Sequence, residues 1–99
     1  MLTAILVAIL LSTIALTTGA EAQAGDCTGT VVLDPGHGGT DSGAVHNNGL
    51  QEKVQTLNVA RSLKTLLEND GCPVFMTRTE DETLSNTQRA NRANTTGAD

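Results

Sequence analysis

Aromatic side chains are almost absent from this sequence, which has one Phe, no Trp and no Tyr among its 99 residues. Because aromatic side chains bury the largest apolar areas, a core here must be built from aliphatic side chains. Basic residues are also scarce, with six Lys and Arg against eleven Asp and Glu and a net charge of −5. Nucleic-acid binding needs clustered Lys and Arg to neutralise phosphates. The sequence has no basic run, so we expect no nucleic-acid partner.

Basic residues are missing from the start of the chain as well, where residues 1–20 are almost wholly apolar or small. Ala20 and Ala22 fit a small-residue cleavage site, so we predict a signal peptide over residues 1–22. No Lys or Arg precedes the apolar run, and an uncleaved membrane anchor is the alternative. Both interpretations place residues 23–99 outside the cytoplasm, secreted or in the cell envelope. Only the anchor would give the chain a stable membrane partner.

Cysteine is limited to two residues, Cys27 and Cys72. In an exported protein such a pair can form a disulfide. Each cysteine lies just before a predicted strand, so both would lie at the same edge of a sheet if those strands are parallel neighbours. Two buried free thiols are the alternative.

The apolar pattern predicts two short strands separated by a helix. The apolar residues at 30–33 and at 73–77 are typical of buried strands. From residue 51, apolar residues recur at three- and four-residue spacing, which indicates an amphipathic helix of about four to five turns. Gly71 is expected to end this helix in a left-handed conformation. Since a helical crossover joins parallel strands, the sequence predicts an α/β protein.

The predicted helices also suggest which side chains face the core. On the first helix, Val59 and Leu66 widen the apolar stripe, so we expect both to face inward. A second, more polar helix is predicted over residues 86–94, with Ala90 and Ala93 inward.

A histidine stands in a glycine-rich loop directly after the first strand, where the sequence reads DPGHGG with His37 in fourth place. Open α/β sheets bind ligands at the carboxyl ends of their strands. Glu52 begins the following helix at the same edge, so imidazole and carboxylate can converge. His and Glu are a donor set suited to Zn²⁺. A solvated turn histidine and a helix-start acid favoured by the helix dipole remain the alternatives.

Several stretches in a fixed order resemble one enzyme family, the zinc-dependent N-acetylmuramoyl-L-alanine amidases of type 3. The resemblance implies a mostly parallel sheet flanked by helices, of which this sequence holds the first strand–helix–strand unit and one further helix. It implies that His37 and Glu52 are zinc ligands, and that the substrate is the amide bond between muramic acid and L-alanine in peptidoglycan. The matching stretches are LDPGHGGTDSGA at 33–44, GLQEK at 49–53, LNVARSLK at 57–64 and MTR at 76–78.

The resemblance covers residues 30–99 and corresponds to the amino-terminal part of the catalytic domain. The family's second histidine ligand and its catalytic glutamate follow the segment that matches residues 97–99, so both are expected beyond Asp99. We therefore expect no catalytic residue within these 99 residues, and negligible turnover by this chain. His46 matches neither missing position. A non-catalytic cell-wall binding or regulatory role is the alternative function.

Two acids and one arginine near the histidine have less certain roles. Asp34 and Asp41 flank His37, and either could orient the imidazole or bond its own backbone in a turn. The two roles are balanced for Asp34, and the turn role is favoured for Asp41. Arg78 follows the second strand and is expected to pair with a nearby acid, although contact with substrate is the alternative.

Overall fold

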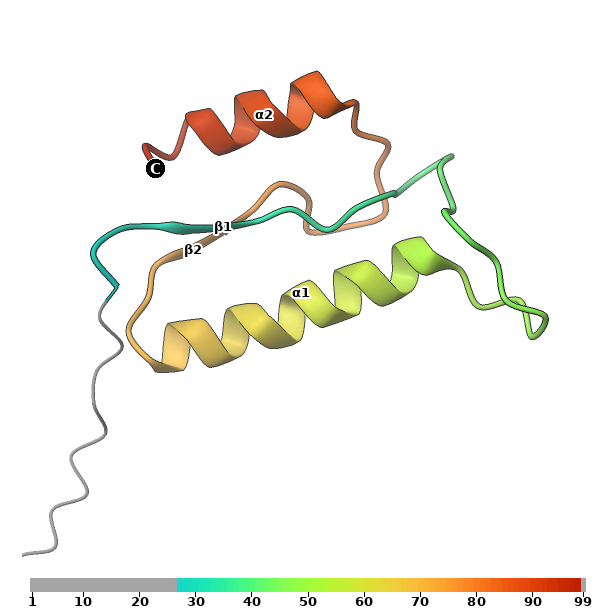
Figure 1. The fold of residues 1–99 in the computed structure, drawn as a ribbon, viewed down its shortest axis with the longest axis horizontal. Coiled ribbons are helices and arrows are strands. Elements are labelled where there is room, and N and C mark those ends of the chain that lie inside the picture. Colours follow the sequence, from blue (N-terminus) through green and yellow to red (C-terminus); the bar gives the residue numbers. More distant parts are fainter. Residues whose placement is uncertain (1–26, 99) are drawn as a thin grey trace, which may run out of the picture.

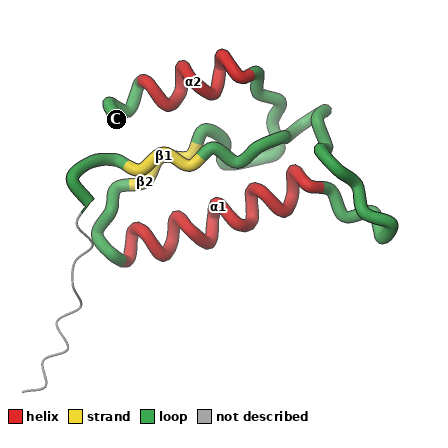
Figure 2. Tube along the Cα trace, viewed as in Figure 1, coloured by secondary structure: helices red, strands yellow, loops and turns green. Residues whose placement is uncertain are grey.

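The computed structural model describes residues 27–98, so the predicted signal peptide and Asp99 lie outside the described range. Two parallel strands lie between two helices, with a long loop joining the first strand to the first helix (Figures 1 and 2). This arrangement confirms the predicted α/β class and the strand–helix–strand unit. The elements are β1 (Val31–Leu33), α1 (Glu52–Asn69), β2 (Val74–Met76) and α2 (Asn86–Asn94).

The two strands pair in parallel over three residues each, with Val32 opposite Phe75. Both are shorter than the sequence predicts. Their hydrogen bonds nevertheless extend one residue further at each end. The Val31 amide donates to the Pro73 carbonyl at 2.8 Å, and the Thr77 amide donates to the Leu33 carbonyl at 2.9 Å.

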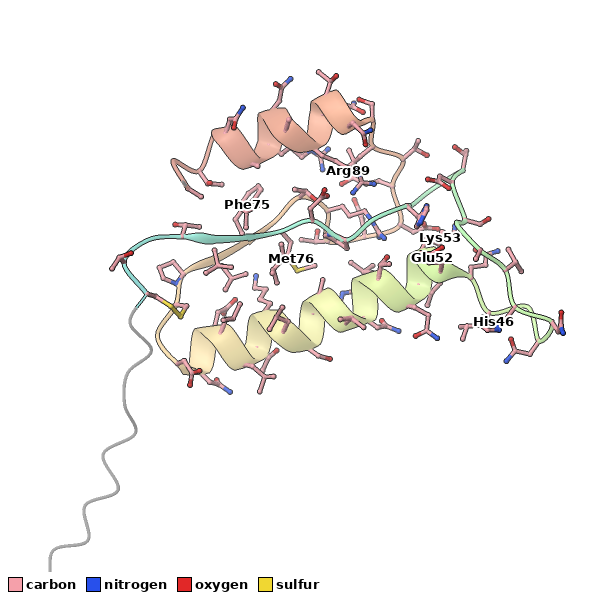
Figure 3. The ribbon with its side chains drawn as sticks, in the orientation of Figure 1. His46, Glu52, Lys53, Phe75, Met76 and Arg89 are labelled. Carbon is pink, nitrogen blue, oxygen red and sulfur yellow. A yellow bond between two sulfur atoms is a disulfide. The ribbon has the colours of Figure 1, made fainter. Side chains whose placement is uncertain are left out.

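Helix α1 covers one face of this small sheet. Leu57 and Ala60 on the helix pack with Met76 of β2, and Leu33 of β1 completes the cluster. Met76 points toward α1 in Figure 3, and Phe75, its neighbour, points toward the α2 side. The helix ends as predicted, because Gly71 follows it at φ 85°.

The apolar stripe of α1 is only partly buried. Val59 is 66% exposed and Leu66 is 63% exposed, which contradicts the prediction that both face the core. The sheet has only two short strands in the described range, and Leu57 and Ala60 are the residues of α1 that are buried. Among the described residues, no helix is long and apolar enough to cross a membrane.

Helix α2 lies on the opposite side of the strands from α1 (Figure 1). It begins with a capping box in which Ser85 and Gln88 exchange hydrogen bonds. Ala93 is half-buried, but Ala90 is exposed, contrary to prediction. Long arginine side chains make hydrogen bonds from α2 to the strand side: Arg92 donates to the Thr77 carbonyl at 2.7 Å.

A disulfide joins Cys27 to Cys72, with their Cα atoms 5.3 Å apart. It links the segment before β1 to the turn between α1 and β2. The cysteines therefore lie at the amino-terminal edge of the sheet, and the loop that contains His37 lies at the carboxyl-terminal edge.

Candidate metal centre

His37 lies in the loop that follows β1, and its backbone is left-handed at φ 60°. It is the one non-glycine residue of the described range with positive φ, a conformation that is uncommon for residues with a side chain. Two backbone hydrogen bonds between Gly38 and Asp41 close a tight turn immediately after His37. This turn directs the imidazole back toward the start of α1.

Glu52 is the first residue of α1, and its carboxylate meets the imidazole at this edge of the sheet. His37 Nε2 and Glu52 Oε1 are 3.3 Å apart. The other carboxylate oxygen, Oε2, accepts a hydrogen bond from the Ala44 amide at 2.9 Å. The convergence argued from strand and helix positions is therefore present.

Gly43 makes this approach possible. A Cβ atom there would lie 2.8 Å from His37 Cδ2 and 2.7 Å from Glu52 Oε2. Those separations are shorter than van der Waals contact, so a side chain at this position would push the two groups apart. The glycine also adopts φ 62°, which residues with a side chain rarely do.

Asp41 contacts the other ring nitrogen of the imidazole, Nδ1. Its Oδ2 lies 2.9 Å from His37 Nδ1, and its Oδ1 accepts a hydrogen bond from the Gly43 amide at 3.0 Å. Asp41 thus fills both of the roles considered for it, the turn role and the orienting role, with one oxygen each.

Asp34 makes no contact with the imidazole in the described structure, so the orienting role considered for it is wrong as a direct one. Its Oδ1 instead accepts hydrogen bonds from Thr77 at 2.6 Å and from Arg89 at 2.7 Å. Burial raises the pKa of Asp34, but these two hydrogen bonds outweigh it and hold the pKa below its ordinary value. The side chain turns away because Arg89 approaches from α2, which local sequence does not reveal.

The charges of the three site residues depend on one another. The hydrogen bond to Asp41, aided by the charge of Glu52, raises the pKa of His37. The same hydrogen bond lowers the pKa of Asp41. The Ala44 amide and the imidazole lower the pKa of Glu52. Both acids are therefore ionised at neutral pH.

This arrangement favours a proton or a metal ion between His37 and Glu52. A carboxylate can only accept hydrogen bonds, so the hydrogen bond to Asp41 places a proton on Nδ1. In the neutral imidazole Nε2 then carries a lone pair that faces the Glu52 carboxylate. Either a second proton or a metal ion must lie between these two acceptors.

The separation of the two atoms fits zinc. Nitrogen and oxygen donors bound to one tetrahedral Zn²⁺ lie about 3.4 Å apart, as calculated from the usual bond lengths. His37 Nε2 and Glu52 Oε1 are 3.3 Å apart. The Asp41–His37 contact also matches the carboxylate that commonly orients a metal-binding histidine.

A third ligand does not join this pair within the part of the chain that the structure describes. Across residues 27–98, no group of three candidate ligands is present. The family resemblance implies a third zinc ligand and a general-base glutamate that are not among residues 27–98. That implication stays a prediction, and the described residues supply only the pair His37 and Glu52.

Arg78 is 1% exposed, and its expected ion pair with an acid is absent among residues 27–98. The guanidinium donates instead to backbone carbonyls, including those of Pro35 at 3.0 Å and Gly36 at 2.9 Å. Burial and the charge of Arg89 lower the pKa of Arg78. Sequence reasoning gave Arg78 the wrong partner because carbonyl acceptors leave no trace in the residue pattern.

Two further basic residues support the loop and were not predicted to do so. Lys53, the residue after Glu52 in α1, is 14% exposed at its side chain and donates to the Gly39 carbonyl at 2.8 Å. Arg89 donates to the His37 carbonyl at 2.9 Å. Figure 3 shows Lys53 beside Glu52, and Arg89 reaching from α2 toward the strands. The position of Lys53 directly after Glu52 was the available signal.

His46 lies apart from this cluster, in the loop before α1 (Figure 3). The residue is exposed. Its position agrees with its exclusion from the predicted ligand set.

The comparison with protein families agrees with this architecture. A family model described as N-acetylmuramoyl-L-alanine amidase, Amidase_3, matches residues 31–99. The chain belongs to this amidase family. The match begins at β1 and includes every residue of the candidate metal centre.

Individual members of the amidase family show the same relationship. N-acetylmuramoyl-L-alanine amidase CwlM of Bacillus licheniformis is 51% identical over 71 residues, which are 70% of this chain and 28% of that protein. The sporulation-specific N-acetylmuramoyl-L-alanine amidase of Bacillus subtilis is 48% identical over the same length, again 28% of that protein. The chain thus spans less than a third of these relatives.

Solved structures of amidases share the fold. N-acetylmuramoyl-L-alanine amidase AmiC2 of Nostoc punctiforme superposes with a TM-score of 0.65 and 38% identity, covering 70% of this chain and 38% of that one. The catalytic domain of CwlV from Bacillus (Paenibacillus) polymyxa var. colistinus gives a TM-score of 0.66 and 35% identity, covering 71% of this chain and 40% of that one.

Proposed function

We propose that residues 31–98 form the part of a zinc-dependent cell-wall amidase domain that supplies two metal ligands, His37 and Glu52. The reaction proposed for the domain is hydrolysis of the amide bond between muramic acid and L-alanine in peptidoglycan. Export through the segment predicted over residues 1–22 would bring the chain to that substrate. Family membership and the names of the relatives support the reaction class.

One observation supports the metal site most directly: His37 Nε2 lies 3.3 Å from Glu52 Oε1. Asp41 holds the proton on the opposite nitrogen, and the Ala44 amide occupies the other oxygen of Glu52. One free donor atom on each residue therefore points at the same position. When bound there, zinc supplies a Lewis acid that activates water and polarises the scissile carbonyl.

Zinc titration of the full chain tests the metal site. Isothermal titration with Zn²⁺ is expected to show one site per chain, and His37→Ala and Glu52→Gln are each expected to abolish it. His46→Ala is the matched control, because His46 is exposed and lies outside the cluster. Zinc binding that survives His37→Ala, or that is lost equally in His46→Ala, would contradict the proposal.

A chimera tests the reaction separately from the metal. Residues 31–98 would replace the matching segment of the Bacillus licheniformis amidase, which is 51% identical to this chain. The chimera is expected to cleave muramoyl-L-alanine bonds in purified muropeptides, and His37→Ala is expected to abolish cleavage. A folded chimera that binds zinc and peptidoglycan without cleaving would favour the non-catalytic cell-wall binding role.

A further inference from the structure

The five consecutive carbonyls of residues 35–39 all accept hydrogen bonds from donors elsewhere in the fold or in the adjacent turn. The Gly38 carbonyl is bound by the Asp41 amide, and the Gly36 carbonyl by Thr56 at 2.7 Å as well as by Arg78. The other three are bound by the side chains of Arg78, Arg89 and Lys53. We call residues 35–39 the histidine loop.

Arg89 differs from the other donors because it binds the carbonyl of the histidine itself. Its Nη2 donates to the His37 carbonyl at 2.9 Å, and its Nη1 donates to the Pro35 carbonyl at 2.8 Å. Within the described residues, Arg89 is the only donor to the His37 carbonyl. One planar guanidinium therefore bridges the carbonyls of the two residues on either side of Gly36, Pro35 and His37, which a lysine ammonium cannot do in the same fixed geometry.

Asp34 fixes Arg89 in turn. Its carboxylate accepts from Arg89 Nη1 at 2.7 Å and from the Thr77 hydroxyl at 2.6 Å. The Arg89 side chain is only 11% exposed, so the direction of its guanidinium is set by packing as well as by charge. A continuous chain of contacts thus runs from the end of β2, through Asp34 and Arg89, to the backbone of His37.

The backbone of His37 needs such support. Its φ of 60° is a conformation that residues with a side chain seldom adopt unless the surroundings impose it. From this backbone conformation the imidazole lies 3.3 Å from Glu52, across the space left open at Gly43.

We propose that Arg89, held by Asp34, is a positioning residue that keeps the His37 imidazole directed at Glu52. That this orientation serves a zinc site rests on the proposed function. The orientation itself is a matter of geometry and can be measured in the zinc-free chain.

Nuclear magnetic resonance of the zinc-free full chain measures the orientation directly. The His37 ring lies against Gly43, because Cδ2 is 2.8 Å from the position that a Gly43 Cβ would occupy. A strong Overhauser effect between the ring and the Gly43 α protons is expected in the unmodified chain. Arg89→Gln is expected to abolish it, and Arg89→Lys, which keeps the charge but cannot span two carbonyls, to leave it weakened.

Zinc affinity gives the second measurement. Loss of a residue that orients a metal ligand typically lowers affinity by about tenfold to a hundredfold. We expect about tenfold for Arg89→Gln and a smaller loss for Asp34→Asn. Arg92→Gln is the matched control, since Arg92 is in the same helix and donates to Glu82 and the Thr77 carbonyl, and to no carbonyl of the histidine loop. It is expected to change neither measurement.

The outcomes separate the two proposals. An unchanged Overhauser effect in Arg89→Gln, or its equal loss in Arg92→Gln, would overturn the positioning role. So would complete unfolding of Arg89→Lys and Arg89→Gln together, because Arg89 would then support the fold as a whole. If the unmodified chain binds no zinc, the proposed function fails, and the Overhauser comparison still decides the role of Arg89.

Discussion

Strand β1 is held in different ways at its two ends. Before it, a covalent bond between Cys27 and Cys72 ties the chain to the turn that precedes β2. After it, arginine and lysine side chains hold the histidine loop through its carbonyl groups. A strand of three residues has too few ladder bonds to fix its own position. The disulfide restricts the unfolded chain, whereas the polar contacts define one geometry in the folded state.

Removing the disulfide should have the largest effect on stability. For a sequence separation of 45 residues, loop-closure entropy predicts a loss of about 4 kcal/mol. We expect Cys27→Ser with Cys72→Ser to lower the free energy of unfolding by about that amount, measured by urea denaturation. Zinc affinity of the folded fraction should change by less than about twofold, because the bond lies at the far edge of the sheet. A large loss of zinc affinity would show that the two ends are coupled.

Removing the buried Arg78 should have the next largest effect on stability. It should act at the end of β1 opposite to the disulfide. Arg78→Met leaves buried carbonyls with fewer donors, so we expect about 3 kcal/mol of destabilisation by urea denaturation. Arg61→Met is the matched control, since Arg61 is exposed and donates one hydrogen bond, to the Thr79 carbonyl. It should cost about 0.5 kcal/mol or less. Equal costs for the two variants would contradict the view that carbonyl contacts stabilise the histidine loop.

Adding one methyl group at the site should affect metal binding more than stability. Gly43→Ala places a Cβ 2.7 Å from Glu52 Oε2 and 2.8 Å from His37 Cδ2, and we expect zinc affinity to fall about tenfold. Gly49→Ala is a close control, because Gly49 also has positive φ, at 85°, but nothing lies within 4 Å of its Cβ position. Both variants carry backbone strain, so only Gly43→Ala should change the zinc titration. Similar affinity losses would assign the effect to strain alone.

The smallest expected effect is a change in proton affinity. Because the Asp41 contact contributes most to the raised pKa of His37, Asp41→Asn should lower that pKa more than Glu52→Gln does. The raised pKa stabilises the fold below about pH 6.5, the ordinary value for histidine, and that stabilisation is lost as pH rises through the folded-state pKa. Titration of the imidazole by nuclear magnetic resonance in zinc-free protein measures both variants. A larger fall in Glu52→Gln would reverse the assignment.

The sequence predicted the fold where the pattern is local. Periodicity found both strands and both helices, and Gly71 ended α1 as expected. It overestimated the core, because helical spacing shows which face of α1 is apolar but not how much sheet covers it. Val59 and Leu66 were therefore expected to face inward and are exposed, and Ala90 on α2 is exposed as well.

At the site, the sequence predicted that His37 and Glu52 meet, because strand ends and helix starts share one edge of a parallel sheet. It did not predict which acid contacts the imidazole. Asp34 is closer to the strand, but its carboxylate accepts hydrogen bonds from Arg89 and Thr77 and not from the imidazole. Asp41 reaches Nδ1 because the turn at Gly38 folds it back.

The sequence by itself determined the strand–helix–strand order, the two residues proposed to bind metal, and the family. These depend on apolar spacing and on motifs that are contiguous in the chain. Only the tertiary structure decided that Asp41 orients His37 and that Arg78, Arg89 and Lys53 hold the histidine loop. Backbone carbonyls are the same in every residue, so a donor that binds them has no complementary residue type that a sequence could reveal.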